Sequence, residues 1–246
     1  VLPAIAASLR DTPGSVGLAM TAYSVSYGSS QLVYGPLSDR FGRIRVIRAA
    51  GLAFSLATLL SACALTTPQF VAARMLAGAF AGAAIPLTLV FIGDTVEYGR
   101  RQIVLGRLSA TTSAALAFSA SLGGALAYLF SWRAMLVAYG LLALVPVACL
   151  WRLPAEADKR PARPARASRF SDFLRDRRAA AVYLAVFLEG FWLWGAVTYL
   201  GAFAERRYGP NLLAIGLLLA CIGLATMGGG LFMGRLRRRF SEGQLA

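Results

Sequence analysis

The sequence predicts an all-α membrane protein, and three observations carry that prediction. Of the 246 residues, 58% are hydrophobic, and the mean hydropathy is +0.63, more than one soluble core requires. The apolar residues form successive runs of about 20, the length that an α-helix needs to cross a bilayer. The charged residues collect between these runs. The lipid bilayer is therefore the expected solvent of this chain.

Seven complete membrane-spanning helices are expected along the chain. They cover residues 14–34, 46–65, 70–92, 108–130, 134–151, 179–203 and 212–233. Turn-forming residues separate them, as in the stretches 66–68 and 208–211. Residues 1–9 are interpreted as the end of an earlier helix and residues 241–246 as the approach to a later one. Together with the absence of an initiator Met, this suggests a truncated fragment.

The basic residues predict the orientation of the helices. The net charge is +14, and residues 35–48, 94–107, 152–178 and 235–239 hold four, three, nine and four Lys or Arg side chains. These segments are alternate connections, so they lie on one side of the membrane, which the positive-inside rule makes cytoplasmic. Topology thus explains the basicity. Nucleic acid is not an expected partner, because no basic stripe with interleaved aromatic residues is present.

A long connection divides the chain. Residues 152–178 are rich in Pro, Ala and Arg and lack apolar periodicity until Phe170, which predicts a cytoplasmic linker. Residues 1–151 then form one helical half, and residues 179–246 begin a second. A weak repeat supports two parallel halves: QLVYGPLSDRF at 31–41 aligns with GLFMGRLRRRF at 230–240, with five identities in eleven positions.

Several chemistries lack their usual residues. The chain has no histidine, and its three cysteines stand alone in apolar sequence, so no metal site, disulfide framework or cofactor is predicted. A membrane-embedded enzyme is an alternative of a different class, but it would need a nucleophile with a base or a metal cluster. No enzymatic activity is therefore expected.

The segment GPLSDRFGRIR at 35–45 resembles the signature loop of the major facilitator superfamily, G-x-L-x-D-R-x-G-R. The matching residues are Gly35, Leu37, Asp39, Arg40, Gly42 and Arg43. The resemblance implies a 12-helix fold of two six-helix bundles: an N-terminal bundle with a truncated first helix, and helices seven and eight of the C-terminal bundle. Gly35 and Gly42 would allow a tight connection. Asp39 would act as a conformational gate that holds the cytoplasmic side shut.

The predicted span 70–92, which would be the fourth helix of the family fold, carries a second motif. Residues 73–84, ARMLAGAFAGAA, are similar to the family pattern R-x-x-x-G-x-x-x-[GA], with Arg74, Gly78 and Gly82 on it. The two glycines form a face on which a neighbouring helix can pack closely. Arg74 lies one to two turns inside the membrane, where a charge needs a partner, water or a function. The resemblance to efflux members of the family implies a role for this arginine in proton coupling. The structural alternative is that its side chain only extends to the outer membrane surface.

The predicted span 108–130, which would be the fifth helix of the family fold, departs from the pattern of proton-coupled exporters. Those proteins usually carry a motif similar to G-P-x-x-G-G in this helix, whereas residues 119–124 of this chain read SASLGG. Gly123 and Gly124 keep the paired glycines, which permit tight packing or a bend. The missing proline weakens the exporter interpretation.

The predicted span 179–203 contains Glu189, which is expected to be protonated or paired in the membrane. The aromatic residues Trp192, Trp194 and Tyr199 follow it. In the family, helices four and seven line the central cavity, so Arg74 and Glu189 become candidates for coupling proton entry to substrate exit. A neutral glutamate bonded to a neighbouring backbone is the structural alternative.

The predicted function is secondary active transport, with proton-coupled efflux of a small organic molecule or drug by alternating access. An uptake symporter for a small metabolite is the nearest alternative, and a non-transporting sensor is more remote. The expected partners are the bilayer, a small-molecule substrate and protons. A monomer in the cell's inner (plasma) membrane is expected.

Overall fold

The computed structural model describes residues 2–152, 180–181, 184–190 and 192, and all regular secondary structure in these parts is helical. The helices are α1 (Leu2–Leu9), α2 (Pro13–Phe41), α3 (Arg43–Ala62), α4 (Thr67–Ala81), α5 (Ala84–Thr95), α6 (Tyr98–Leu129) and α7 (Trp132–Trp151). A backbone in lipid has no water to bond, so helices that satisfy their own N–H and C=O groups are the structure the apolar runs require.

Helix starts follow the capping residues in the sequence. The Thr12 hydroxyl accepts a hydrogen bond of 3.2 Å from the backbone N–H of Ser15, and Pro13 opens α2 with a preset φ. The Ser131 hydroxyl accepts one of 3.1 Å from the N–H of Ala134 and starts α7 in the same way. These polar side chains place the connections at the ends of the apolar runs.

Helix α2 is longer than the sequence predicts. It was expected to end at residue 34, but it continues through the motif to Phe41, so most of the expected signature loop is helical. Pro36 lies inside the helix without ending it, and the first residue outside it is Gly42. Gly42 adopts a φ of 92°, which side-chain-bearing residues rarely adopt, and its N–H donates to the Ser38 carbonyl at 2.9 Å. The chain then enters α3 directly.

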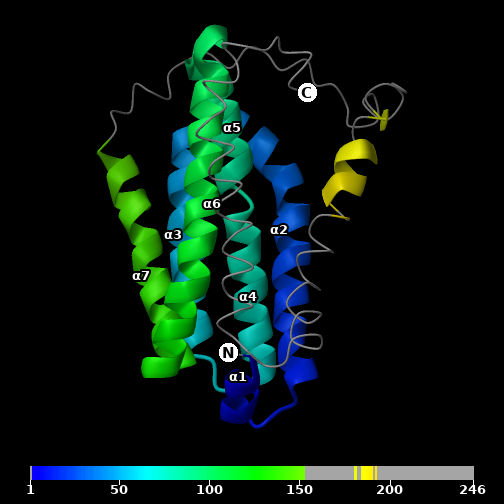
Figure 1. Cartoon of the computed structure of the whole chain (residues 1–246), viewed down its shortest axis with the longest axis vertical. Helices are drawn as coiled ribbons and strands as arrows, with labels where there is room; N and C mark the ends of the chain where they lie inside the picture. The colour runs from blue at the N-terminus through cyan, green and yellow to red at the C-terminus, as the bar shows by residue number, and fades with distance from the viewer. Residues whose placement is uncertain (1, 153–179, 182–183, 191, 193–246) are drawn as a thin grey trace, which may run out of the picture.

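The predicted span 70–92 is divided into α4 and α5 by Gly82 and Ala83. Pro86 explains the break: it lacks an N–H for the Gly82 carbonyl, and its ring crowds that carbonyl. The Ala83 N–H instead bonds to the Phe80 carbonyl at 3.4 Å, a tighter turn than the α-helix. The two helices still form one column (Figure 1).

The long helices stand side by side, with the short α1 across one end (Figure 1). Helix α4 packs against α2 on one side and α3 on the other, and α7 packs against α3 and α6. Three stretches of the described chain are long and apolar enough to cross a membrane: α3, Thr67–Thr95 and α7. Helices α2 and α6, at 29 and 32 residues, have sufficient length with more Ser, Thr and Gly. The predicted span 212–233 and most of 179–203 lie outside the described residues.

Two arginines join the antiparallel helices α3 and α7 at opposite ends. Arg133, at the start of α7, donates to the carbonyl of Ala62, the last residue of α3, at 2.6 Å. Arg48, near the start of α3, donates to the Leu150 carbonyl in the last turn of α7. Each guanidinium thus bonds a carbonyl that has no partner within its own helix.

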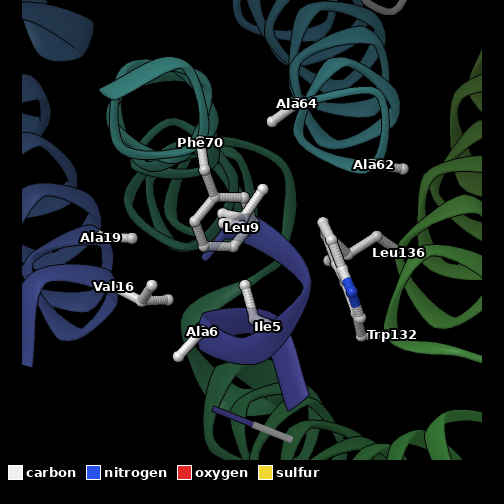
Figure 2. Close-up of a cluster of buried hydrophobic side chains, with 10 residues drawn as sticks. All are labelled: Ile5, Ala6, Leu9, Val16, Ala19, Ala62, Ala64, Phe70, Trp132 and Leu136. Carbon is white, nitrogen blue, oxygen red and sulfur yellow. The ribbon is translucent and has the colours of Figure 1, made fainter. Parts of the chain in front are cut away.

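An apolar cluster closes the end of the bundle where α1 lies (Figure 2). Its buried members come from five helices and the segment after α3: Ile5, Ala6, Leu9, Val16, Ala19, Ala62, Ala64, Phe70, Trp132 and Leu136. The Phe70 and Trp132 rings meet edge to face, with centroids 5.7 Å apart. This cluster lies far along the helices from the residue 35–48 segment, which we call the basic end.

Candidate functional site

An arginine at the basic end joins three helices. The Arg43 guanidinium lies 3.2 Å from a carboxylate oxygen of Asp39 on α2 and 2.6 Å from one of Asp94 on α5. Its third nitrogen donates to the Ser38 hydroxyl at 3.3 Å. One planar guanidinium with several donors suits such branched bonding. We call Asp39, Arg43 and Asp94 the basic-end network.

Partial exposure limits the energy of this network. The side chains of Arg43, Asp39 and Asp94 are 23%, 38% and 46% exposed, so solvent screens the two ion pairs. The geometry therefore gives α2, α3 and α5 a solvent-screened connection of modest strength.

Asp94 forms its ion pair across the basic end rather than with a basic residue beside it in the sequence. Arg100 and Arg101 are its nearest basic residues along the chain, but the ion pair seen for Asp94 is with Arg43, 51 residues away. Arg101 instead donates to the carbonyls of Gly93, in the last turn of α5, and Val96, the residue after α5, at 2.6 and 2.9 Å. The turn between α5 and α6 is thereby held by backbone bonds, which leaves Asp94 directed at α3.

The remaining motif residues have different surroundings. Leu37 packs against a buried cluster that contains Tyr34, Ala83 and Leu87. The Arg40 guanidinium lies 5.3 Å from the centroid of the Phe41 ring. No described atom lies within 4 Å of the position that a Cβ on Gly35 would occupy. The close backbone approach expected at Gly35 is therefore not seen. Of the two motif glycines Gly35 and Gly42, Gly42 is the one with a positive φ.

The arginine within the membrane, Arg74, lies at the interface of α4 with α2. Its guanidinium carbon stands 4.6 Å from the centroid of the Tyr23 ring, and the Tyr23 ring stacks on that of Tyr27. Among the described residues, no carboxylate lies within ion-pair distance of Arg74. The sequence required a partner for this charge, and in the described part of the chain that partner is an aromatic face.

Small residues bring α4 against α2 at this interface. A Cβ on Gly78 would collide with the Tyr23 carbonyl oxygen and stand 2.6 Å from the Ser26 hydroxyl. One turn further, a Cβ on Gly82 would collide with the Ser30 hydroxyl. The Ser26 hydroxyl donates to the Met75 carbonyl at 2.7 Å, and Tyr34 donates to the Ala79 carbonyl at 3.0 Å. The backbones of α4 and α2 can approach this closely because Gly78 and Gly82 have no side chain between them.

The paired glycines of α6 face α7 in part. A Cβ on Gly123 would collide with the Tyr139 hydroxyl, and this hydroxyl donates to the Ser119 carbonyl. The surroundings of Gly124 lie outside what the structure describes. Gly123 therefore makes room for an aromatic side chain that joins α6 to α7.

The candidates beyond the linker are only partly described. Glu189 and Trp192 lie in a short helical part of the chain, and both side chains are exposed there. Trp194 and Tyr199 lie outside the described residues. Glu189 and Arg74 are not within ion-pair distance, so the structure does not bring the two coupling candidates together in the part described.

Sequence reasoning missed three contributors to these sites: Ser38, Tyr23 and Ser26. A signal for the last two was present, because Tyr23, Ser26, Tyr27 and Ser30 recur at intervals of three and four on one helix. That periodicity marks a polar and aromatic stripe along α2. Its partner helix could be identified only once α4 was seen to pack there.

The fold and these features define a polytopic helical membrane protein with a charged connection at one end and an isolated charge within its helices. The sequence profile of the Major Facilitator Superfamily matches residues 1–245. The chain belongs to this family.

Curated relatives refine the comparison. A chloramphenicol resistance protein of Pseudomonas aeruginosa is 27% identical over 96% of this chain and 56% of its own length. The 4-hydroxybenzoate transporter PcaK of the same species is 30% identical over 64% of the chain and 35% of its own length. The multidrug resistance protein MdtL of Shigella flexneri is 27% identical over 67% and 41%. The chain thus spans about half or less of the length of these relatives.

Proposed function

We propose that the protein is a proton-coupled secondary transporter that exports a small organic molecule or drug by alternating access. The observation that carries this proposal is the likeness to a resistance protein along 96% of the chain. The basic-end network supports it, since a carrier that alternates between two states needs contacts that can be made and broken at one membrane face. The protein would act as a monomer in the inner membrane.

The gate in this proposal is the basic-end network. Asp39 and Asp94 hold Arg43 between them, and this closed arrangement ties the ends of α2, α3 and α5. In the outward-facing state it would keep the cytoplasmic side shut, with Asp39 also facing the N-terminus of a helix in the other half. Loss of these ion pairs would favour opening to the cytoplasm.

The coupling residues in this proposal are Arg74 and Glu189. A carboxyl on a cavity-lining helix can take up a proton, and a guanidinium elsewhere in the cavity favours its ionised form when the two approach. Proton uptake by Glu189 would then be linked to release of substrate. Trp192, Trp194 and Tyr199 would supply the aromatic surface for an organic substrate.

A transport assay tests the proposal. The protein, expressed from its complete reading frame, is placed in inverted membrane vesicles, and accumulation of labelled chloramphenicol is followed with and without an imposed pH gradient. We expect accumulation that depends on the gradient and falls to a small residual rate in Arg74→Ala and Glu189→Gln. Gradient-independent transport, or normal transport by both variants, would show that the coupling assignment is wrong.

Uptake of a small aromatic acid is the second candidate function, because PcaK is named as a 4-hydroxybenzoate transporter and is 30% identical over the aligned part. Right-side-out vesicles with labelled 4-hydroxybenzoate separate the two directions. Proton-driven uptake there, without chloramphenicol accumulation in inverted vesicles, would favour the uptake carrier over the exporter.

A further inference from the structure

The aromatic ring of Tyr23 on α2 contacts the guanidinium of Arg74 on α4. Its guanidinium carbon lies 4.6 Å from the Tyr23 ring centroid, within the range of a cation–π contact. The Tyr27 ring, with its centroid 6.3 Å from that of Tyr23 and an interplanar angle of 11°, stacks on Tyr23. The stacking restrains the orientation of the Tyr23 ring.

The backbone beneath Tyr23 is also held in place. A Cβ on Gly78, one turn after Arg74, would collide with the Tyr23 carbonyl, so α4 meets α2 directly below the ring. The Ser26 hydroxyl donates to the carbonyl of Met75, the residue after Arg74, at 2.7 Å. The Tyr23 ring on α2 and the Arg74 guanidinium on α4 are thus held at a fixed distance, because Gly78 and the hydrogen bond of Ser26 set the separation of the two helices.

We propose that Tyr23 is the positioning residue of Arg74, and the proposal of a transport role for this contact rests on the proposed function. An ionised carboxylate at this point would neutralise the guanidinium and hold it. The face of an aromatic ring stabilises the cation and leaves its charge uncompensated. Arg74 is therefore kept within the helix bundle while its N–H groups stay available to an anionic group that arrives during the cycle.

The physical part of the proposal is tested by the side-chain NMR signal of Arg74 in protein labelled with ¹⁵N-arginine, expressed from its complete reading frame in detergent micelles. A proton above a ring face is shifted upfield by the ring current. We expect the Arg74 Nε–H signal, assigned by its loss in Arg74→Lys, to lie upfield, to remain there in Tyr23→Phe and to move downfield in Tyr23→Leu. Tyr98→Leu, which removes an exposed tyrosine ring from α6, is the matched control and should leave the Arg74 signal upfield.

An Arg74 signal in Tyr23→Leu that matches the unmodified protein would overturn the positioning role. If Tyr23→Leu does not fold, replacement of Tyr23 by pentafluorophenylalanine keeps the ring shape and reverses its quadrupole. The guanidinium should then leave the ring face, and an unmoved signal would again overturn the proposal.

The functional part is tested by a double-mutant cycle on chloramphenicol transport. We expect Tyr23→Leu to lower the rate by about tenfold, the scale of a desolvated cation–π contact, while Tyr23→Phe retains it. Tyr23→Leu combined with Arg74→Ala should be no slower than Arg74→Ala alone, because both changes remove one unit. Additive losses would contradict the role. Absence of transport by the unmodified protein would count against the proposed function, whereas the NMR signal would still decide the position of Arg74.

Discussion

At the scale of single residues, a few side chains and one glycine set the connections between helices. Gly42 is the clearest case, because one residue reverses the chain between two helices of 29 and 20 residues. Its backbone angles, φ 92° and ψ 141°, lie in a region open to glycine and costly for other residues. The backbone conformation at position 42 therefore explains why the motif has a glycine there.

Substitution of Gly42 by alanine should destabilise the folded protein by about 1–3 kcal/mol, because a Cβ strains this backbone conformation. Unfolding of the purified protein in mixed micelles, titrated with denaturing detergent, measures the change. Gly28→Ala is the control, since a Cβ at Gly28 meets nothing within 4 Å. Equal stability of the two variants would show that the strain at Gly42 is relieved by a shift of the backbone.

Asp11, in the connection between α1 and α2, should make stability depend on pH. The Thr67 hydroxyl beside it, followed by the backbone N–H of Thr12, holds the pKa of the Asp11 carboxyl below its ordinary value of 3.8. A lowered pKa in the folded state stabilises the fold above the unfolded-state pKa, and this contribution is lost as the pH falls through the folded-state pKa. Thermal unfolding between about pH 5 and pH 2 should therefore show a smaller decline for Asp11→Asn than for the unmodified protein. Parallel curves would contradict this.

At the scale of helices, packing is organised in pairs. Helices α2 and α4 meet through glycines and serine hydroxyls, whereas α3 and α7 are joined by arginines at both ends and by a hydrogen bond of 2.6 Å from the buried Ser55 hydroxyl to the Gly140 carbonyl. Hydroxyls within helices bond to carbonyls and so can be buried without an unsatisfied donor. The polar residues of these spans thereby serve helix contact.

The arginines at the ends of the α3–α7 pair should contribute independently to stability. Arg48→Met and Arg133→Met each remove the donor to a helix-end carbonyl, and each should cost about 1–3 kcal/mol. Because they lie at opposite ends, their effects should add. Detergent unfolding measures both, with the exposed Arg107→Met as a control expected to change stability by less than about 0.5 kcal/mol. A cost as large for the control would mean that charge alone is responsible.

At the scale of the whole molecule, the two ends of the described helix bundle are held together by different kinds of contact. One end is closed by the apolar cluster of Figure 2, which draws on α1, α2, α3, α4 and α7. The basic end is held by screened ion pairs around Arg43. In the described part of the chain, buried apolar side chains therefore hold one end of the bundle and partly exposed ion pairs hold the other. This difference supports the proposed gate at the basic end.

Removal of either acid of the basic-end network should loosen that end. Asp39→Asn and Asp94→Asn each leave Arg43 with one anionic partner, so hydrogen exchange of residues 35–48 should accelerate in both variants. The double variant should exchange less than the sum of the two predicts, because both ion pairs share Arg43. Exchange followed by mass spectrometry measures this, with Glu97→Gln as the matched control. Unchanged exchange and unchanged transport in Asp39→Asn would contradict the gate.

Much of the fold was predictable from sequence, because the signals that define spans are local. Runs of apolar residues indicated the helices, turn residues such as those at 66–68 a break between them, and arginine placement the basic end. Two errors came from proline context: Pro36 was taken with a loop but lies in a helix, and Pro86 was placed in an uninterrupted span but causes a break. A third is the start of α6, which begins at Tyr98 although residues 94–107 were predicted to be a connection. Whether a proline ends a helix depends on the neighbours that satisfy the freed carbonyl, and those are tertiary.

The sequence by itself determined the membrane class, the succession of helices and the position of the charged motif, since hydrophobicity, capping and charge act over one or two turns. Only the tertiary structure decided which charges meet. Arg43 pairs with Asp94 across 51 residues, and Arg74 lies on Tyr23 from a different helix. Such contacts depend on which helix faces pack together, and this is set by close approach at residues such as Gly78.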